Sequence, residues 1–154
     1  MAVRFEAGAL DSGDAQLLVR AMADELRMLY DGLDIDSEDM PKAGPAELGP
    51  PDGAFLVGYE AGSAICCGGL KALPDGACEI KRMYVVPRAR GRGVAAELLI
   101  ALENAARGLG YSIARLDTGP LQQSAQCLYE RAGYRPIGNF NANPMASFWG
   151  ERRL

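Results

Sequence analysis

The sequence predicts an α+β fold, in which a central mixed β-sheet of about six or seven strands lies between helices in a three-layer α/β/α arrangement. Hairpin signals separate the first predicted strands, which are therefore expected to pair as antiparallel neighbours. Later in the chain a strand, a helix and a second strand follow one another, and such a crossover makes the two strands parallel. With 154 residues, the chain is expected to form one domain over residues 1–154.

The N-terminal half is predicted to contain one helix, one long loop and two strands. Apolar residues recur at helical spacing over residues 15–30, directly after the helix-start signal of residues 11–14. Residues 40–53 are rich in proline and glycine and predict a loop or mobile flap. Residues 54–60 and 63–71 have strand composition and are separated by a two-residue turn that contains glycine, so they predict a hairpin.

The C-terminal half continues with a third strand over residues 77–86, which Pro87 stops because proline has no backbone donor. A helix follows over residues 94–107 and ends at glycines, which favour helix termination. The remaining predicted elements are a strand at 112–118, parallel to the third, a helix at 122–132, and strands at 135–138 and 146–152.

A glycine-rich turn between the third strand and its helix carries the strongest functional signal, in the run Arg90-Gly91-Arg92-Gly93-Val94-Ala95. Strand, turn and helix start place free backbone N–H groups and a positive helix-dipole end at one point, which predicts an anion site and most naturally a phosphate site. A P-loop would need Lys and then Ser or Thr after the last glycine, where Val94 and Ala95 stand instead.

The pattern R-x-x-G-x-A of residues 90–95 resembles the acetyl-CoA pyrophosphate loop of the GNAT family of N-acetyltransferases. The neighbouring sequence supports the resemblance, with Met83-Tyr84-Val85-Val86-Pro87 before the loop and Ala125-x-x-Leu128-Tyr129-Glu130-x-x-Gly133-Tyr134 after it. It extends over residues 54–137. It implies a GNAT-like fold and an enzyme that moves acetyl from acetyl-CoA, its co-substrate, to a primary amine by direct attack.

The resemblance also implies roles for individual residues. Backbone groups of Met83, Tyr84 and Val85 would bind the pantetheine arm, and residues 90–95 would bind the pyrophosphate. Gln122 stands where the family commonly has an asparagine that contacts the cofactor, so a longer amide is expected there. The phenol of Tyr129 would protonate the departing thiolate, a transfer that its ordinary pKa of ~10 suits; the alternative is an aromatic side chain that only packs between helix and sheet.

Glu79 is the candidate general base, because the family often places its base at the start of this strand; a water molecule is the other candidate. A strand without a bulge would place Glu79 on one face together with Lys81, Met83 and Val85. Lys81 would then lower the pKa of Glu79 or pair with it. The alternative is that Glu79 has no catalytic role and its carboxylate faces solvent.

The composition and net charge argue against several kinds of binding site and catalytic base. The net charge is −4 and histidine is absent, which argues against nucleic-acid binding, a zinc site and a histidine base. The four cysteines, including Cys127, are expected to be buried in a reducing cytoplasm. No apolar run is long enough to predict a membrane span. An acidic cluster could steer a cationic amine or simply be solvated, and comprises Asp31, Asp34, Asp36, Glu38 and Asp39.

Several points stay open at this stage. A non-catalytic CoA-binding sensor or interaction module on the same fold is the alternative function, and the acyl-chain length and a homodimer are undecided. The acceptor is expected to be a small-molecule or peptide amine. Residues 31–53 and 139–147 are expected to select it, since the cofactor occupies the other half of the site.

Overall fold

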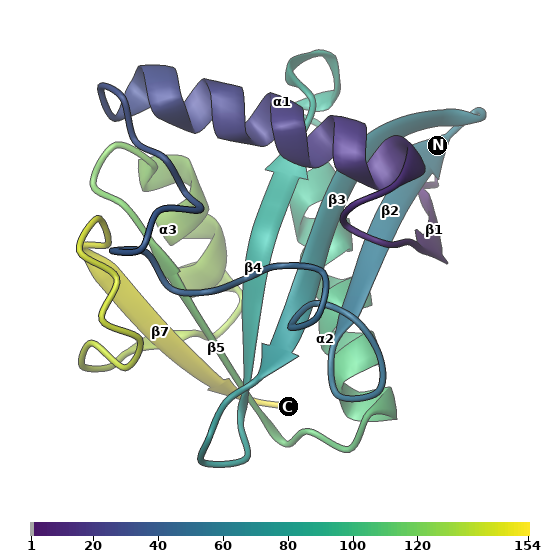
Figure 1. Ribbon diagram of the computed structural model, residues 1–154. Coiled ribbons are helices and arrows are strands. Elements are labelled where there is room, and N and C mark those ends of the chain that lie inside the picture. Colours follow the sequence, from purple (N-terminus) through teal and green to yellow (C-terminus); the bar gives the residue numbers. More distant parts are fainter. Residues whose placement is uncertain (1) are drawn as a thin grey trace.

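In the computed structural model, which describes residues 2–154, seven strands form one sheet with helices on both faces (Figure 1). The strands lie in the spatial order β1-β2-β3-β4-β5-β7-β6. They are β1 (Arg4–Ala7), β2 (Ala54–Glu60), β3 (Ser63–Ala72), β4 (Cys78–Val85), β5 (Ile113–Thr118), β6 (Arg135–Pro136) and β7 (Phe148–Arg153). The helices are α1 (Gly13–Leu29), α2 (Val94–Gly108) and α3 (Gln123–Arg131). The predicted three-layer fold is confirmed.

The predicted elements are present, and most of their ends differ from the prediction by one or two residues. Strand β1 was not predicted: it has four residues, most of them exposed, so it lacks the apolar alternation that marks a half-buried strand. It pairs antiparallel with β2, where Phe5 lies opposite Gly58. The strand expected at 135–138 is shortened to Arg135–Pro136.

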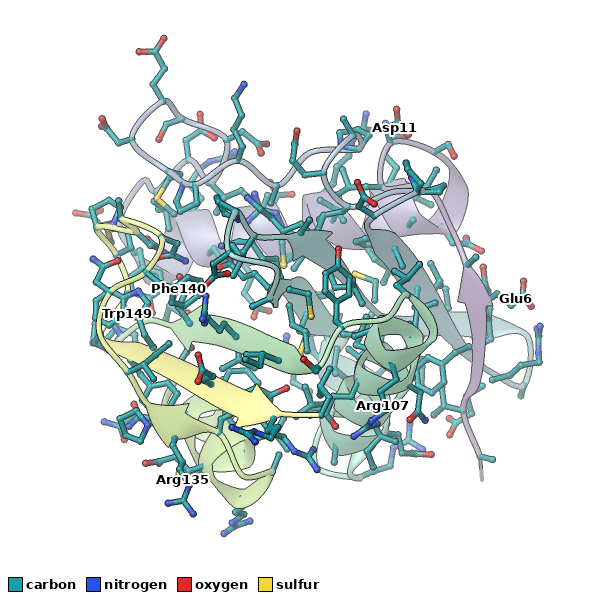
Figure 2. The ribbon with its side chains drawn as sticks, turned by 90° about the horizontal axis from the view of Figure 1, so that it is seen from below. Glu6, Asp11, Arg107, Arg135, Phe140 and Trp149 are labelled. Atoms are coloured by element: carbon teal, nitrogen blue, oxygen red, sulfur yellow. The ribbon has the colours of Figure 1, made fainter. Side chains whose placement is uncertain are left out.

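Two apolar clusters hold the layers together, one on each face of the sheet. The view from below shows the sheet between helices α1 and α2 (Figure 2). Helix α1 packs Leu18 and Met22 against the sheet side chains of Phe55 and Tyr84. Helix α2 covers the opposite face with Leu98, Leu99 and Leu102, all fully buried; burying one such side chain stabilises the fold by about 1.5–3 kcal/mol. Helix α3 lies on the same side as α2.

Strand β4 contains a bulge that changes which face its residues occupy. Gly69 pairs with Lys81 and Cys67 pairs with Tyr84, so β4 has one more residue than β3 between the two pairs. Arg82 lies at this point with a φ of 61°. Because an extra residue reverses the alternation, Met83 and Val85 pack toward α2, whereas Tyr84 faces α1. Glu79 therefore does not share a face with Met83 and Val85, as it would in a strand without the bulge.

Strands β4 and β5 separate soon after they meet. They are parallel, as predicted, but pair only at Cys78 with Ala114 and at Glu79 with Arg115. Beyond these residues β5 pairs with β7 along its whole length and diverges from β4 (Figure 1). Among the described residues, the C-terminal half of β4 therefore presents a backbone edge without a strand partner toward β5.

Candidate active site

The glycine turn after β4 forms an anion cradle. A single 3₁₀ turn, Pro87–Ala89, leads into Gly91 and Gly93, whose φ angles of 78° and 80° favour glycine. Within residues 2–154, the backbone N–H groups of residues 91–96 find no backbone or side-chain acceptor. They are grouped at the N-terminus of α2, where the helix dipole also favours negative charge. The turn can therefore bind a phosphate through its backbone.

The two arginines of the turn already have acidic partners. Arg90 donates to both carboxylate oxygens of Glu25, at 2.8 and 3.0 Å, and its Nε donates to the Val85 carbonyl at 2.9 Å. Arg92 forms a bidentate pair with Glu60, with both distances 3.1 Å. Exposed pairs of this kind contribute about 0–1 kcal/mol, so a phosphate can compete for either arginine. The backbone N–H groups are thus the main anion ligands.

A pocket opens where β4 and β5 separate. It has a volume of about 110 Å³ and lies between the end of α1, the loop that follows α1, strand β4, the end of β5, helix α3 and the 139–147 loop. Of the predicted site residues it brings together Met83, Gln122 and Tyr129, whereas Glu79 does not line it. Both loops that were expected to select the acceptor contribute, for example through Ile35 and Asn143.

Tyr129 reaches the pocket from α3 with only 7% of its surface exposed. Its hydroxyl donates to the sulfur of Met83 at 3.7 Å, a weak acceptor that a stronger one can replace. Burial, helped by the negative charge of Asp117, raises the pKa of Tyr129 far above its usual value. The phenol therefore remains a neutral hydrogen-bond donor in the pocket.

Gln122 connects the two sides of the pocket. Its Oε1 accepts a hydrogen bond from the Tyr30 hydroxyl at 3.0 Å and a longer one from the Gly119 N–H at 3.4 Å. The Tyr30 oxygen in turn accepts the Leu121 N–H at 3.2 Å. The end of α1 is thereby tied to the start of α3. Tyr30 was not singled out in the sequence, because its partners are more than 90 residues away.

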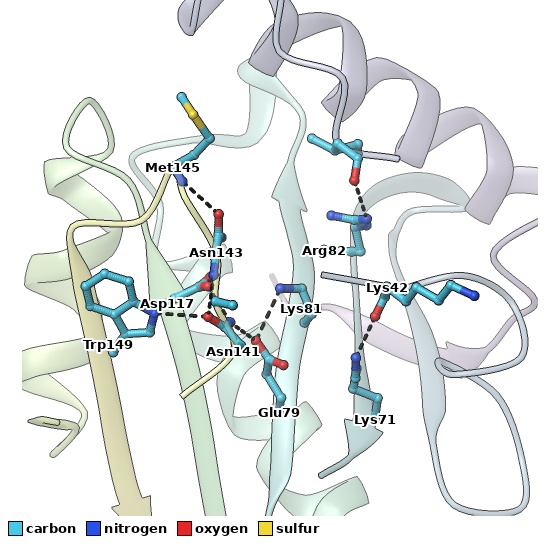
Figure 3. Close-up of polar contacts among 12 residues, drawn as sticks. Lys42, Lys71, Glu79, Lys81, Arg82, Asp117, Asn141, Asn143, Met145 and Trp149 are labelled. Atoms are coloured by element: carbon cyan, nitrogen blue, oxygen red, sulfur yellow. Dashed lines mark hydrogen bonds and ion pairs between the residues drawn. The ribbon is translucent and has the colours of Figure 1, made fainter. Parts of the chain in front are cut away.

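Glu79 belongs to a buried polar network beneath the pocket (Figure 3). It is 1% exposed, and its Oε2 accepts hydrogen bonds from Lys81 Nζ at 3.2 Å and Asn141 Nδ2 at 2.8 Å. The Asn141 amide also donates to Asp117 Oδ2 at 2.6 Å. The solvent-facing alternative for Glu79 is therefore wrong, and the predicted pairing with Lys81 is confirmed.

Asparagines of the 139–147 loop complete this network. Asn143 Nδ2 donates to Asp117 Oδ2 at 2.9 Å, and the indole of Trp149 donates to Asn141 Oδ1 at 3.1 Å (Figure 3). Sequence reasoning chose this loop as an acceptor-selecting element but did not identify Asn141, Asn143 or Asp117 individually. Three asparagines at alternate positions, 139, 141 and 143, were the available signal.

Three of the four cysteines are buried as expected, but Cys127 is exposed on α3. The buried face of this short helix is centred on Tyr129, so the assignment of Cys127 to the core was wrong. Within residues 2–154, no group of three His, Cys, Asp or Glu residues is arranged to hold a metal ion. Among the same residues, no helix is both long and apolar enough to span a membrane.

The acidic residues after α1 are all exposed, whereas Leu33, Ile35 and Met40 of the same loop line the pocket. Asp34 accepts the Asp36 N–H at 2.9 Å, and Asp36 lies 3.6 Å from Arg82 Nη2. Arg82 itself lines the pocket and was not anticipated from the sequence.

Comparison with known proteins agrees with this geometry. The model of the acetyltransferase (GNAT) family matches residues 19–134. An IAA acetyltransferase of Azospirillum brasilense is 35% identical over 105 residues, which cover 66% of this chain and 69% of that protein. A Klebsiella pneumoniae structure, provisionally described as an acyl-CoA N-acyltransferase, is 27% identical with a TM-score of 0.78 and covers 99% and 97% of the two chains. A GNAT acetyltransferase of Elizabethkingia anophelis, solved with acetyl-CoA bound, is 17% identical with a TM-score of 0.69 over 99% and 98% of the chains.

Proposed function

Because this chain belongs to the acetyltransferase (GNAT) family, we propose that it transfers acetyl from acetyl-CoA to the primary amine of a small molecule or peptide by direct attack. One observation carries the proposal: the pocket beside Tyr129, the edge of β4 from Met83 to Val85 and the N–H groups of residues 91–96, which are free within the described residues, follow one another along the chain. The whole chain, residues 1–154, would act as a single catalytic domain.

The residues fit the parts of acetyl-CoA along this path. The N–H groups of residues 91–96 would hold the pyrophosphate, with Arg90 and Arg92 at its margin. Backbone groups of Met83, Tyr84 and Val85 would hydrogen-bond the pantetheine arm, because β5 has moved away from this edge. The thioester would then lie at the pocket, near Met83 and Tyr129. A backbone N–H aimed at its carbonyl oxygen typically contributes ~3 kcal/mol to transition-state binding.

The chemistry requires a neutral amine, a new N–C bond and a protonated leaving group. An alkylamine with a pKa near ~10 must first lose a proton. A water molecule in the pocket is the better-placed base, since Glu79 lies behind Lys81 and does not line the pocket. As nitrogen bonds to the acetyl carbon, the C–S bond breaks and the sulfur leaves as thiolate. Tyr129 donates its proton to that sulfur. The nitrogen loses its second proton as the amide forms, and this proton restores the phenol, whereas the first proton leaves to solvent through the water.

Replacing Gly93 with Val tests the proposal at its foundation. The new side chain would enter the open space that the phosphates need and would strain a φ of 80°, so calorimetry should detect no CoA binding. Gly110→Val is a matched control, because Gly110 has a φ of 93° and equally open surroundings but lies beyond the far end of α2. Unchanged CoA affinity in Gly93→Val would contradict the proposal.

Thiol release from acetyl-CoA with a panel of amines then separates transfer from mere binding. Release that depends on an added amine is the expected result. Tight CoA binding with no release for any amine would favour the non-catalytic sensor instead.

A further inference from the structure

Arg82 places a buried and poorly compensated cation in the pocket. Its side chain is 8% exposed. Within residues 2–154 its polar contacts are a 3.5 Å hydrogen bond to the Ile35 carbonyl and a 3.6 Å ion pair with Asp36, whose own side chain is 80% exposed. A guanidinium has five N–H donors, and good N–H···O distances are 2.7–3.2 Å. Most of the hydrogen-bonding capacity of Arg82 is therefore unused.

The other acids near Arg82 already have partners. Glu79 accepts from Lys81 and Asn141 through Oε2, although its buried Oε1 has no partner among the described residues, and Asp117 accepts from two asparagine amides. Burial lowers the pKa of Arg82 even though the charges of Asp36, Asp117 and Glu79 oppose the change. Lys81 has a counter-ion in the folded protein, whereas Arg82 lacks a close one.

The backbone holds Arg82 in this position. Its φ of 61° is uncommon for a residue other than glycine and arises at the bulge of β4. Strained conformations of this kind persist where the surrounding structure enforces them, often at ligand sites.

The position of Arg82 along β4 identifies the ligand it would meet. On the proposed function, the pantetheine arm runs from Met83 toward Gly91, so Arg82 lies past the thioester on the acceptor side. The part of the lining that comes from α1 and the loop after it is mainly apolar and includes Met22, Leu26, Leu33 and Met40. The pocket volume of about 110 Å³ is near the ~150 Å³ of an apolar cavity that binds benzene, so one small apolar group fits.

We propose that the acceptor is an amino-acid-type zwitterion with an apolar side chain, and that Arg82 binds its carboxylate. The guanidinium fork matches a carboxylate, and Asp117 at the floor of the same pocket is the complementary group for the ammonium. This inference rests on the proposed acetyl transfer and specifies its substrate class.

Wild-type protein tests the inference with acceptors matched in sets of three. Methionine, leucine and phenylalanine are each compared with the corresponding amide and with the decarboxylated amine, and thiol release gives kcat/KM. We expect the amino acids to exceed both analogues by roughly 10- to 100-fold, the effect of a charge-assisted hydrogen-bonded pair. The ammonium of the amide is more acidic than that of the amino acid, and the ammonium of the decarboxylated amine is less acidic, so ionisation cannot cause a preference over both analogues.

An equal or greater kcat/KM for the amides and decarboxylated amines would overturn the inference and leave acetyl transfer intact. Thiol release with none of the amines would overturn both.

The variants Arg82→Gln and Arg82→Lys locate the effect. Arg82→Gln should raise the KM for the amino acid roughly 10- to 100-fold, leave the decarboxylated amine within about twofold, and leave the affinity for acetyl-CoA unchanged. Arg82→Lys should recover part of the loss, because it keeps the charge without the fork. Arg107→Gln, an exposed site on α2, is the control, and thermal unfolding checks that each variant is folded. An equal loss for both kinds of acceptor in Arg82→Gln would refute the carboxylate contact.

Discussion

Replacing Glu79 with Gln should destabilise the protein strongly, because the change leaves a buried lysine without its counter-ion. Glu79 is 1% exposed and lies 3.2 Å from Lys81, which is itself buried. Removing one member of a buried ion pair typically costs about 3–5 kcal/mol. In a domain of this size each kcal/mol lowers Tm by about 2–4 °C, so we expect a fall of roughly 6–20 °C.

Urea unfolding of four proteins measures the pair directly: wild type, Glu79→Gln, Lys81→Met and the double variant. The double variant should regain much of the stability that Glu79→Gln loses, because it removes the unpaired charge. Glu130→Gln, on the exposed surface of α3, should stay within about 0.5 kcal/mol of wild type. A Glu79→Gln protein as stable as wild type, or a double variant no more stable than Glu79→Gln, would refute this account of the network.

The same variant examines the role of Glu79 in catalysis. If the carboxylate only positions Lys81 and Asn141, Glu79→Gln should reduce the turnover of folded enzyme by a similar factor at every pH. A loss concentrated at low pH, where the amine is most protonated, would instead show that Glu79 takes the proton and that our choice of water is wrong.

Two further predictions concern other buried groups. Tyr129→Phe should lower kcat about 10²-fold with little change in acetyl-CoA affinity, measured by thiol release and calorimetry, and an undiminished kcat would exclude Tyr129 as the acid. Burial raises the pKa of Cys66 and Cys78 to about 11 and that of Cys67 to about 12, whereas an unfolded thiol titrates near ~8.5. The unfolded chain therefore loses thiol protons first, so stability is complete below pH ~8.5 and falls above it, by up to about 1.4 kcal/mol per pH unit and thiol. Urea unfolding between pH 7 and 10 should show this fall, with a smaller slope in Cys67→Ala; a flat profile would contradict it.

Local features of the chain were predictable because they depend on short-range physics. The positive φ angles at Gly91 and Gly93, the stop at Pro87 and the start of α2 follow from residue types within one turn of the backbone. The anion cradle was therefore evident before any tertiary contact was known. Tyr129 was also singled out, but Cys127 on the same helix was assigned to the core, because the local sequence of a short helix does not tell which of its faces is buried.

The acceptor side of the site depends on contacts between distant segments. Glu79 and Asn141 are 62 residues apart, and Arg82 meets Ile35 across 47 residues, so nothing in the local sequence indicates either contact.

What the sequence by itself determined was the order of the elements, the glycine turn and the identity of the residues beside it, all of which follow from local conformational preference. Only the tertiary structure decided that β4 bulges at Arg82, because a bulge is defined by pairing with β3 and not by the residues of β4 alone. That single extra residue sends Met83 toward α2 and leaves Arg82 lining the pocket. The register between strands therefore determines which side chains the acceptor meets.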